Sequence, residues 1–319
     1  MARRPLCLIV NPSAGRGRTA RLLPRVEAEL RARGLAFRTE RTYSLAHARE
    51  LARETLERGE IAAGMGGDGL LGAIAGELRG TDGVLSVLPG GRGNDFARKL
   101  GVGTDPVRAC ALFDDGRETA IDVADAGGAT FLGIASAGID SDVQILANAT
   151  RIPLGGMIYV VSTLRALARW HRADWEVEVD GETLGFTGYS VAVANSGVFG
   201  GGMYLVPGAR LDDGLLDVVL LRDCARLKYL VNLPRVFRGT HVGSRDLTFI
   251  QARTVRFRAS RRERSPIACG SSRVSTLPGS EVPPPRPAVR TSVPTALAAT
   301  TLGPSSVMGR APSAHGARP

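Results

Sequence analysis

The sharpest chemical feature of the sequence is a turn of glycines around one carboxylate, Gly-Gly-Asp-Gly at residues 66–69, directly after the apolar run 61–65. Glycines let backbone N–H groups approach a ligand closely. A helical pattern begins near Leu70, and because a helix N-terminus attracts anions, phosphate is the ligand that this turn fits. Asp68 would repel phosphate unless a divalent cation lay between them, which predicts Mg²⁺. The alternative is a structural strand-to-helix turn in which Asp68 caps a helix.

Two further glycine-rich turns, at residues 11–17 and 89–95, each follow a short apolar run. In the second of them Arg92 and the glycine amides suit an anionic ligand, while Asn94 and Asp95 could fix the loop or bond to a sugar hydroxyl. Three such turns reinforce one another, so we favour a phosphate site over three purely structural turns.

Other chemistries find less support in the sequence. The turn at 66–69 lacks the Lys-Ser/Thr ending of a P-loop, and no GxGxxG with an acidic residue about twenty positions on indicates a dinucleotide oxidoreductase. The four histidines are scattered without metal-ligand spacing, and residues 190–196 lack the spacing of a nucleophile elbow.

The three turns must be positioned by the elements that precede them. Strand-like runs and helical patterns alternate through the first part of the chain, with strands predicted at 6–10, 36–42, 61–65 and 84–88 and helices at 18–33, 45–56 and 70–78. Such alternation predicts a doubly wound, mostly parallel sheet. Ligands bind such sheets at the carboxyl ends of the strands, where all three turns lie.

After about residue 121 strand-like runs dominate, interrupted by helical patterns at 157–170 and 224–237, which predicts an antiparallel β-sandwich. From about residue 265 the amino-acid composition changes abruptly. This segment contains ten of the 18 prolines, one acidic residue and no aromatic residue. Such a segment cannot offset its ordering entropy by burial. We therefore predict a nucleotide-binding domain at 1–122, a sandwich domain at 123–264 and a disordered low-complexity tail at 265–319.

Composition limits the partners of the protein. The net charge of +10 is spread among interleaved acids, and no aromatic-interleaved basic run indicates nucleic-acid binding, so an anionic membrane surface or a phosphate substrate fits better. Four widely spaced cysteines predict neither disulfides nor a metal site and favour the cytoplasm. The apolar run 6–10 is too short for a signal peptide, and no stretch suits a transmembrane helix. We expect a soluble protein, at most peripheral at the membrane. The sequence indicates no oligomeric state.

Taken together, the motifs resemble the bacterial diacylglycerol-kinase and sphingosine-kinase family, which includes the YegS-like lipid kinases. The resemblance covers residues 6–259 and depends on the order of five segments, namely 11–12 (Asn-Pro), 66–69, 93–98 (Gly-Asn-Asp-Phe-Ala-Arg), 133–140 (Gly-Ile-Ala-Ser-Ala-Gly-Ile-Asp) and 195–217. Each segment alone is modest, but the ordered set is specific.

The resemblance implies an N-terminal nucleotide domain, a C-terminal β-sandwich, and ATP with Mg²⁺ in the cleft between them. Asp68 is the implied catalytic residue. The residues assigned to the nucleotide are Asn11, Thr42, Gly66, Gly67, Asp68, Gly69, Leu70, Leu71, Gly72, Arg92, Gly93, Asn94 and Asp95. The turn at 211–215 resembles the family's structural metal site, in which the Asp213 carboxylate and the carbonyls of Leu211 and Leu215 would hold Mg²⁺. A solvated β-turn is the alternative for this segment.

Three departures from the family pattern stand out. Leu70, Gly72 and Ala73 replace the usual Thr and Asn-Glu, and Arg92 replaces the usual Thr of the second glycine turn. The third departure is at residues 266–272, where the family has an Asp-Gly-Glu segment whose carboxylate is the proposed general base and this chain has no acid. The closing strands are expected to be absent as well. We therefore hypothesise a shift of the reading frame between about residues 261 and 272, which the DNA sequence tests.

The function implied is ATP-dependent phosphorylation of a diacylglycerol-like lipid hydroxyl at a membrane surface, as in phospholipid biosynthesis. The alternative is a non-catalytic protein that binds nucleotide or lipid without turnover. Gly-Gly-Asp-Gly turns also occur in NAD kinases and phosphofructokinases, but residues 195–217 favour the lipid-kinase family.

Overall fold

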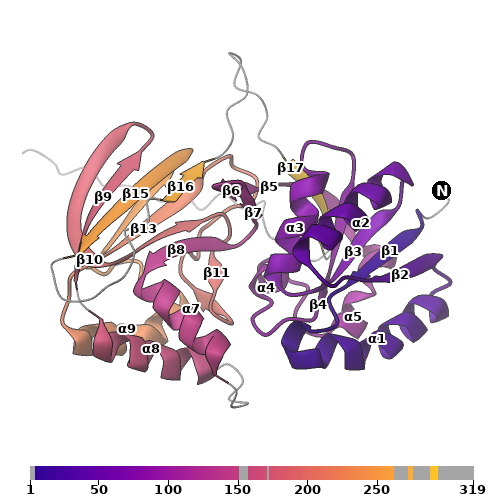
Figure 1. Ribbon diagram of the computed structural model, residues 1–319, viewed down its shortest axis with the longest axis horizontal. Helices are drawn as coiled ribbons and strands as arrows, with labels where there is room; N and C mark the ends of the chain where they lie inside the picture. Colours follow the sequence, from indigo (N-terminus) through magenta and orange to yellow (C-terminus); the bar gives the residue numbers. More distant parts are fainter. Residues whose placement is uncertain (1–3, 151–156, 171, 262–271, 276–287, 294–319) are drawn as a thin grey trace, which may run out of the picture.

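The computed structural model describes residues 4–150, 157–170, 172–261, 272–275 and 288–293. These residues form two lobes, each built on its own sheet (Figure 1). Apart from two short strands, the predicted tail at 265–319 lies outside the described residues. Within the described ranges no helix is long and apolar enough to cross a bilayer.

The first lobe contains a six-stranded sheet in the order β2-β1-β3-β4-β17-β5. Its strands are β1 (Leu6–Val10), β2 (Phe37–Arg41), β3 (Ile61–Gly66), β4 (Val84–Pro89), β5 (Arg117–Asp122) and β17 (Ala288–Val293). The first four strands and β17 pair in parallel, whereas β5 is antiparallel to β17. The predicted doubly wound, mostly parallel sheet is confirmed.

Helices cover both faces of this sheet. They are α1 (Ala14–Ala32), α2 (Leu45–Glu57), α3 (Asp68–Leu78), α4 (Asp95–Lys99), α5 (Pro106–Ala109) and α6 (Leu112–Asp115). Because side chains alternate along a strand, β1 sends Cys7 and Ile9 into the core under α2 and α3, and Leu6, Leu8 and Val10 into the core under α1, α5 and α6. Burial on both faces explains why β1, β3 and β4 are nearly continuous apolar runs.

The second lobe contains an antiparallel sheet in the order β14-β13-β10-β9-β15-β16-β6-β7, with β8 also paired to β10. The strands are β6 (Ala124–Ala126), β7 (Ala129–Phe131), β8 (Ile134–Gly138), β9 (Ala173–Val179), β10 (Glu182–Ala194), β13 (Leu216–Arg222), β14 (Leu247–Ala252), β15 (Thr254–Arg261) and β16 (Ser272–Ser275). A small hairpin joins β11 (Val198–Phe199) to β12 (Met203–Tyr204). The helices α7 (Ile139–Ala149), α8 (Met157–Arg169) and α9 (Arg226–Arg238) lie together on one side (Figure 1).

The long strand β10 turns this sheet into the two layers of a sandwich. Its first half pairs with β9 and its second half with β8 and β13, with a register shift after Gly188. A Cβ atom at Gly188 would lie 2.3 Å from the Leu221 carbonyl oxygen, so only glycine permits this close passage. Trp175 and Phe186 of one layer then pack in one core with Val193 of the other. The predicted antiparallel sandwich is confirmed.

Strands β16 and β17 correct one expectation. The sequence led us to expect that the closing strands are absent, yet β16 pairs with β15 and β6, and β17 occupies the slot between β4 and β5. Pairing with distant partners supplies hydrogen bonds that the composition of residues 265–319 did not reveal. The chain passes from the first sheet to the second between Asp122 and Ala124 and returns through β17. The boundaries at 122 and 264 stay a prediction, as does the shifted reading frame.

Candidate active site

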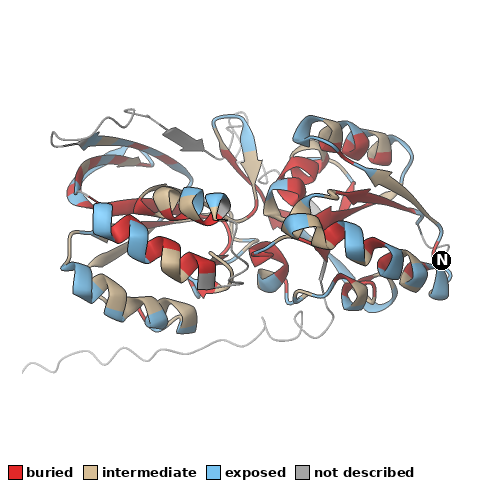
Figure 2. Cartoon of the chain, turned by 60° about the horizontal axis from the view of Figure 1, so that its bottom comes forward, coloured by how far each residue is buried: buried red, intermediate tan, exposed pale blue. Residues whose placement is uncertain are grey.

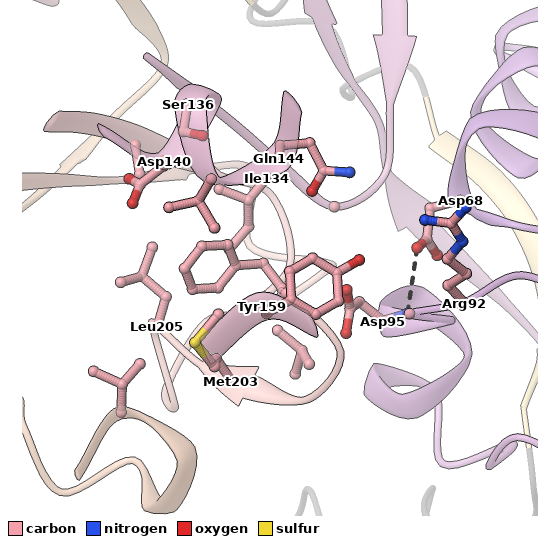
Figure 3. Close-up of a pocket in the computed structure, with 18 of the residues that line it drawn as sticks. Asp68, Arg92, Asp95, Ile134, Ser136, Asp140, Gln144, Tyr159, Met203 and Leu205 are labelled. Atoms are coloured by element: carbon pink, nitrogen blue, oxygen red, sulfur yellow. Dashed lines mark hydrogen bonds between the residues drawn. The ribbon is translucent and has the colours of Figure 1, made fainter. Parts of the chain in front are cut away.

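A cavity of about 750 Å³ lies where the two lobes meet. One end is lined by the turns that follow β1, β3 and β4, which are neighbouring strands of the first sheet. The other end is lined by side chains of the second lobe (Figure 3). Parallel strands therefore bring the three glycine-rich turns to one sheet edge, as predicted, and that edge opens into the second lobe.

Asp68 ties the turn after β3 to the turn after β4. Its two carboxylate oxygens accept hydrogen bonds from the backbone N–H groups of Asp95 (3.3 Å) and Phe96 (3.1 Å), at the start of α4. Burial raises the pKa of the Asp68 carboxyl, and these two hydrogen bonds oppose the rise. Asp68 therefore caps a helix, as the alternative interpretation held, but the helix is α4 rather than α3. It also lines the cavity, so capping leaves it available to a ligand (Figure 3).

The two glycine turns pack directly on each other. The N–H groups of Gly90 and Gly91 donate to the Gly66 carbonyl oxygen at 2.7 and 2.9 Å. A Cβ atom at Gly91 would lie 2.7 Å from the Cα atom of Gly67, so the absence of a side chain is a condition of this contact. Asn94 has a left-handed backbone, is 4% exposed, and bonds through its side chain to both the N–H and the carbonyl of Gly91. Asn94 fixes the loop.

Arg92 and Asp95 connect this edge to the second lobe. The Arg92 guanidinium donates to the Ala147 carbonyl oxygen of α7 at 3.1 Å, and the Asp95 carboxylate accepts from the Gly201 N–H at 3.0 Å. Burial is the main cause that raises the pKa of Asp95 to about 6; the neighbouring Asp68 adds to the rise and the hydrogen bond from Gly201 opposes it. Asp95 can therefore gain or lose a proton near neutral pH.

The predicted nucleotide residues divide into two groups. Those that line the cavity are Asn11, Gly67, Asp68, Gly69, Leu70, Arg92, Gly93 and Asp95. Thr42, Gly66, Leu71, Gly72 and Asn94 do not line it. The Thr42 hydroxyl donates to the Ser44 carbonyl at 2.6 Å, just before α2 begins, and Leu71 is buried in the core. A Cβ atom at Gly72 would lie 2.8 Å from the Thr130 carbonyl oxygen, so this glycine lets α3 pack against β7.

The far end of the cavity holds residues that the sequence analysis did not assign to the site. Ile134 of β8, Met203 of β12 and Leu205 line it together with the ring of Tyr159 from α8, which lies beside Asp95 (Figure 3). Ile134, Met203 and Leu205 lie in the motifs 133–140 and 195–217, but as apolar residues they carried no sign of a place in the cavity, and Tyr159 lies in no motif. Figure 2 shows buried residues running along the strands on both sides of this junction.

Asp140 is one of the polar groups at that end. It begins the first turn of α7 and lines the cavity (Figure 3). Burial raises its pKa to about 6, while a hydrogen bond with the side chain of Ser190 opposes the rise. The motif at 133–140 ends at this aspartate, so a signal existed, but it did not indicate a place in the cavity.

Comparison with known proteins gives the family. The diacylglycerol kinase catalytic domain matches residues 5–126, and the YegS C-terminal NAD kinase beta sandwich-like domain matches residues 133–300. The chain belongs to the diacylglycerol kinase family. It is 32% identical over 256 residues to a diacylglycerol kinase of Mycobacterium tuberculosis strain H37Rv, with 77% of this chain and 82% of that protein covered. It is 37% identical over 203 residues to a protein of Pseudomonas fluorescens named "Probable lipid kinase YegS-like", with 61% and 66% covered.

A solved structure agrees in fold. A diacylglycerol kinase from Bacillus anthracis superposes with a TM-score of 0.69 at 20% identity, covering 92% of this chain and 98% of that one. This protein is thus a lipid kinase of the diacylglycerol kinase family with that family's two-lobed fold. The family match also continues past the composition break near residue 265 and includes β16 and β17.

The turn at 211–215 of this lipid kinase offers hard oxygen donors, which suit Mg²⁺ in kind. The Leu211 carbonyl oxygen accepts from the Asp122 N–H, and one Asp213 carboxylate oxygen accepts from the Leu215 N–H at 2.9 Å. The ammonium of Lys99 donates to the Ala209 carbonyl oxygen next to this turn. Among the described residues no group of three or more His, Cys, Asp or Glu side chains forms a metal cluster.

Lys99 adds a positive charge to this acidic turn. Burial lowers the pKa of Lys99, and the charges of Asp217, Asp212 and Asp213 oppose that fall. An ammonium that shares these carboxylates competes with a cation for them. The turn therefore offers donors of the type that Mg²⁺ prefers, and the positive charge of Lys99 would oppose a cation there.

Proposed function

We propose that this protein transfers the γ-phosphoryl group of ATP to the hydroxyl of a diacylglycerol-like lipid, with Mg²⁺ as cofactor. One observation carries the proposal: a single cavity is lined at one end by the glycine turns and at the other by apolar side chains. A phosphate donor and a lipid would reach each other only in such a shared space.

At the first end, the backbone of residues 67–69 and Arg92 would hold the phosphates. The N-terminus of α3 lines the cavity at residues 67–69, and Gly67 and Gly91 let the two turns pack against each other with no side chain between them. Mg²⁺ would neutralise phosphate charge beside Asp68. Leu70 offers no hydroxyl, so we propose that Arg92, which has replaced the family's usual threonine, supplies a charge-assisted bond instead.

At the second end, we propose that acyl chains lie along Ile134, Met203 and Leu205. Apolar walls with a few polar groups are typical of sites for such ligands. Asp140 could hydrogen-bond to the polar part of the lipid and so set how deep it enters. The lipid hydroxyl would then lie at the junction, beside Tyr159 and Asp95 (Figure 3).

The hydroxyl proton requires an acceptor. The family acid predicted near residues 266–272 has no counterpart in this sequence, and 266–271 lie outside the described residues. We propose that Asp95 takes the proton, because it lines the cavity at the junction and has a pKa of about 6. The Gly201 N–H would hold its carboxylate in place.

A non-catalytic binder is the second candidate, and the absent family acid favours it. The test is to measure ATP consumption and phosphatidic acid formation with dioleoylglycerol in mixed micelles, with and without Mg²⁺. Turnover that is lost in Asp68→Asn supports the kinase. Thermal stabilisation by ATP without turnover supports the binder. The same cavity serves both functions, so ATP protection alone does not separate them.

If the kinase is active, its product is a phosphatidic acid, which places it in phospholipid biosynthesis. A substrate that resides in a bilayer requires the enzyme to act at the membrane surface. We therefore propose a cytoplasmic protein that binds the membrane peripherally.

A further inference from the structure

Helices α8 and α9 form one exposed face of the second lobe. The Arg226 guanidinium at the start of α9 donates to the Trp170 carbonyl oxygen just after α8 at 3.0 Å, and Tyr229 of α9 packs against the core that holds Trp170. The two helices therefore lie side by side, as Figure 1 shows. We call their outer surface the α8–α9 face.

The two sides of α9 differ in their surroundings. Tyr229, Leu233 and Val236 line the cavity, whereas Leu227 and Val231 are 72% and 63% exposed. No residue of α9 is fully buried, and Figure 2 shows a helix surface of intermediate and exposed residues on this side. A helix that exposes apolar side chains one turn apart has an outer side that folding leaves uncovered.

The charges of the α8–α9 face are of one sign. Both helices lack acidic residues, and together they contain six basic ones, which are Arg165, Arg169, Arg226, Lys228, Arg235 and Arg238. Some of this charge is engaged, since Lys228 pairs with Asp246 from outside the helices at 2.6 Å. Arg165, Arg169 and Arg238 form no ion pair with other residues of the described ranges.

We propose that the α8–α9 face docks on the surface of an anionic lipid bilayer, with Leu227, Val231 and Leu164 inserted among the headgroups. Apolar side chains interleaved with Arg and Lys on a helical surface complement acyl chains below and lipid phosphates above. Since α9 is also a wall of the cavity, docking brings the cavity against the bilayer. This inference rests on the proposed lipid substrate, because it gives that substrate a short path into the cavity.

The first test is co-sedimentation of the full chain with vesicles of phosphatidylcholine, with and without about 30% phosphatidylglycerol. We expect binding to the anionic vesicles, weakened by salt. The double variant Leu227→Gln/Val231→Gln should bind about tenfold more weakly. The control is Leu184→Gln, the same chemical change at a leucine of β10 that is 38% exposed, and it should bind as the wild type does.

The second test separates this proposal from the kinase proposal. With dioleoylglycerol in anionic vesicles the double variant should be slower than the wild type, and with water-dispersed dioctanoylglycerol the two should be equal. A wild type that binds vesicles but turns over neither lipid removes the kinase and leaves the docking face. Equal vesicle binding by the wild type and the double variant overturns the docking face. A second result would also overturn it: the wild type forms a concentration-dependent dimer, and the double variant no longer dimerises but still binds vesicles. The α8–α9 face would then bind a second copy of the chain instead of a bilayer.

Discussion

The two ends of the cavity differ in what lines them, which is mainly backbone at one end and side chains at the other. At the end proposed for the nucleotide the backbone positions the site: the N–H groups of Gly90 and Gly91 donate to the Gly66 carbonyl oxygen, and the Asp68 carboxylate accepts from two N–H groups of α4. At the end proposed for the lipid the walls are side chains from β8, β12 and three helices, with Asp140 among the polar groups. A backbone cradle tolerates few substitutions, because a single Cβ atom collides, whereas an apolar wall tolerates exchange of one aliphatic residue for another. The proposed phosphate site can therefore be recognised from sequence motifs, whereas the proposed lipid site cannot.

The largest effect is expected from removing β17, which supports only the nucleotide end. A chain that stops at residue 287 lacks the strand between β4 and β5. Both strands then lose the backbone hydrogen bonds to β17, and one edge of each is exposed to solvent. We expect the melting temperature to fall by about 10 °C or more, or the first lobe to fail to fold. Calorimetry compares this chain with one that stops at residue 300, which should melt close to the full chain. Equal melting of both truncated chains would mean that β17 contributes no stability to the first sheet.

Asp68→Ala should come next, with a loss of turnover of at least about 10³-fold. Alanine removes both the group proposed to act on the phosphates and the cap on α4. Asp68→Asn is the sharper variant, because its amide oxygen can still accept from the α4 backbone while the charge is lost. We expect Asp68→Asn to be as inactive as Asp68→Ala but to melt at a higher temperature, as measured by product formation and thermal unfolding. If Asp68→Asn turns over like the wild type, the carboxylate is structural only.

Asp95→Asn tests the junction between the two ends. We expect kcat to fall by about 10²-fold, and the rise of wild-type kcat with pH, centred near the pKa of about 6, to disappear. Stability depends on pH in the opposite direction from kcat. Because the folded-state pKa lies above the ordinary 3.8, the folded state binds the proton more tightly, so the free energy of unfolding falls as pH rises from 3.8 to about 6. Denaturant titrations should show a shallower fall in Asp95→Asn, with Asp68, Asp140 and Asp217, whose pKa burial also raises, contributing to the remainder. An unchanged pH profile of kcat would exclude Asp95 as the proton acceptor.

Ile134→Trp should affect only the lipid end. The larger side chain would fill part of the cavity and raise the KM for dioleoylglycerol about tenfold, with less effect on dioctanoylglycerol and none on the KM for ATP. Ile134→Val is the matched control, which enlarges the cavity slightly and should leave every KM within about twofold. A rise in the KM for ATP would show that the two ends are not independent.

The smallest effect is expected at the turn 211–215. Lys99→Gln removes the ammonium charge beside Asp213, so Mg²⁺ measured by calorimetry in the absence of nucleotide should bind about three- to tenfold more tightly. Lys99→Arg, which keeps the charge, should bind as weakly as the wild type. Equal binding by all three chains would place the cation elsewhere.

The fold was predictable where the determinants are local. Strands β1, β3 and β4 are apolar runs ended by glycine-rich turns, and the helices between them have apolar residues at helical spacing, so these strands were predicted within a residue or two. Residues 288–293 were not. Their place depends on β4 and β5, about 170 to 200 residues earlier in the chain, and composition describes a segment without its distant partners.

By itself the sequence determined where the glycine-rich turns after β1, β3 and β4 lie and that Asp68 stands in one of them, because glycine turns are requirements of backbone geometry that act over a few residues. The tertiary structure alone decided that Asp68 caps α4, that Asp95 meets Gly201, and that Ile134, Tyr159 and Leu205 enclose one space. These contacts form between elements far apart in the chain, so their energies depend on the packing of the two lobes rather than on any local pattern.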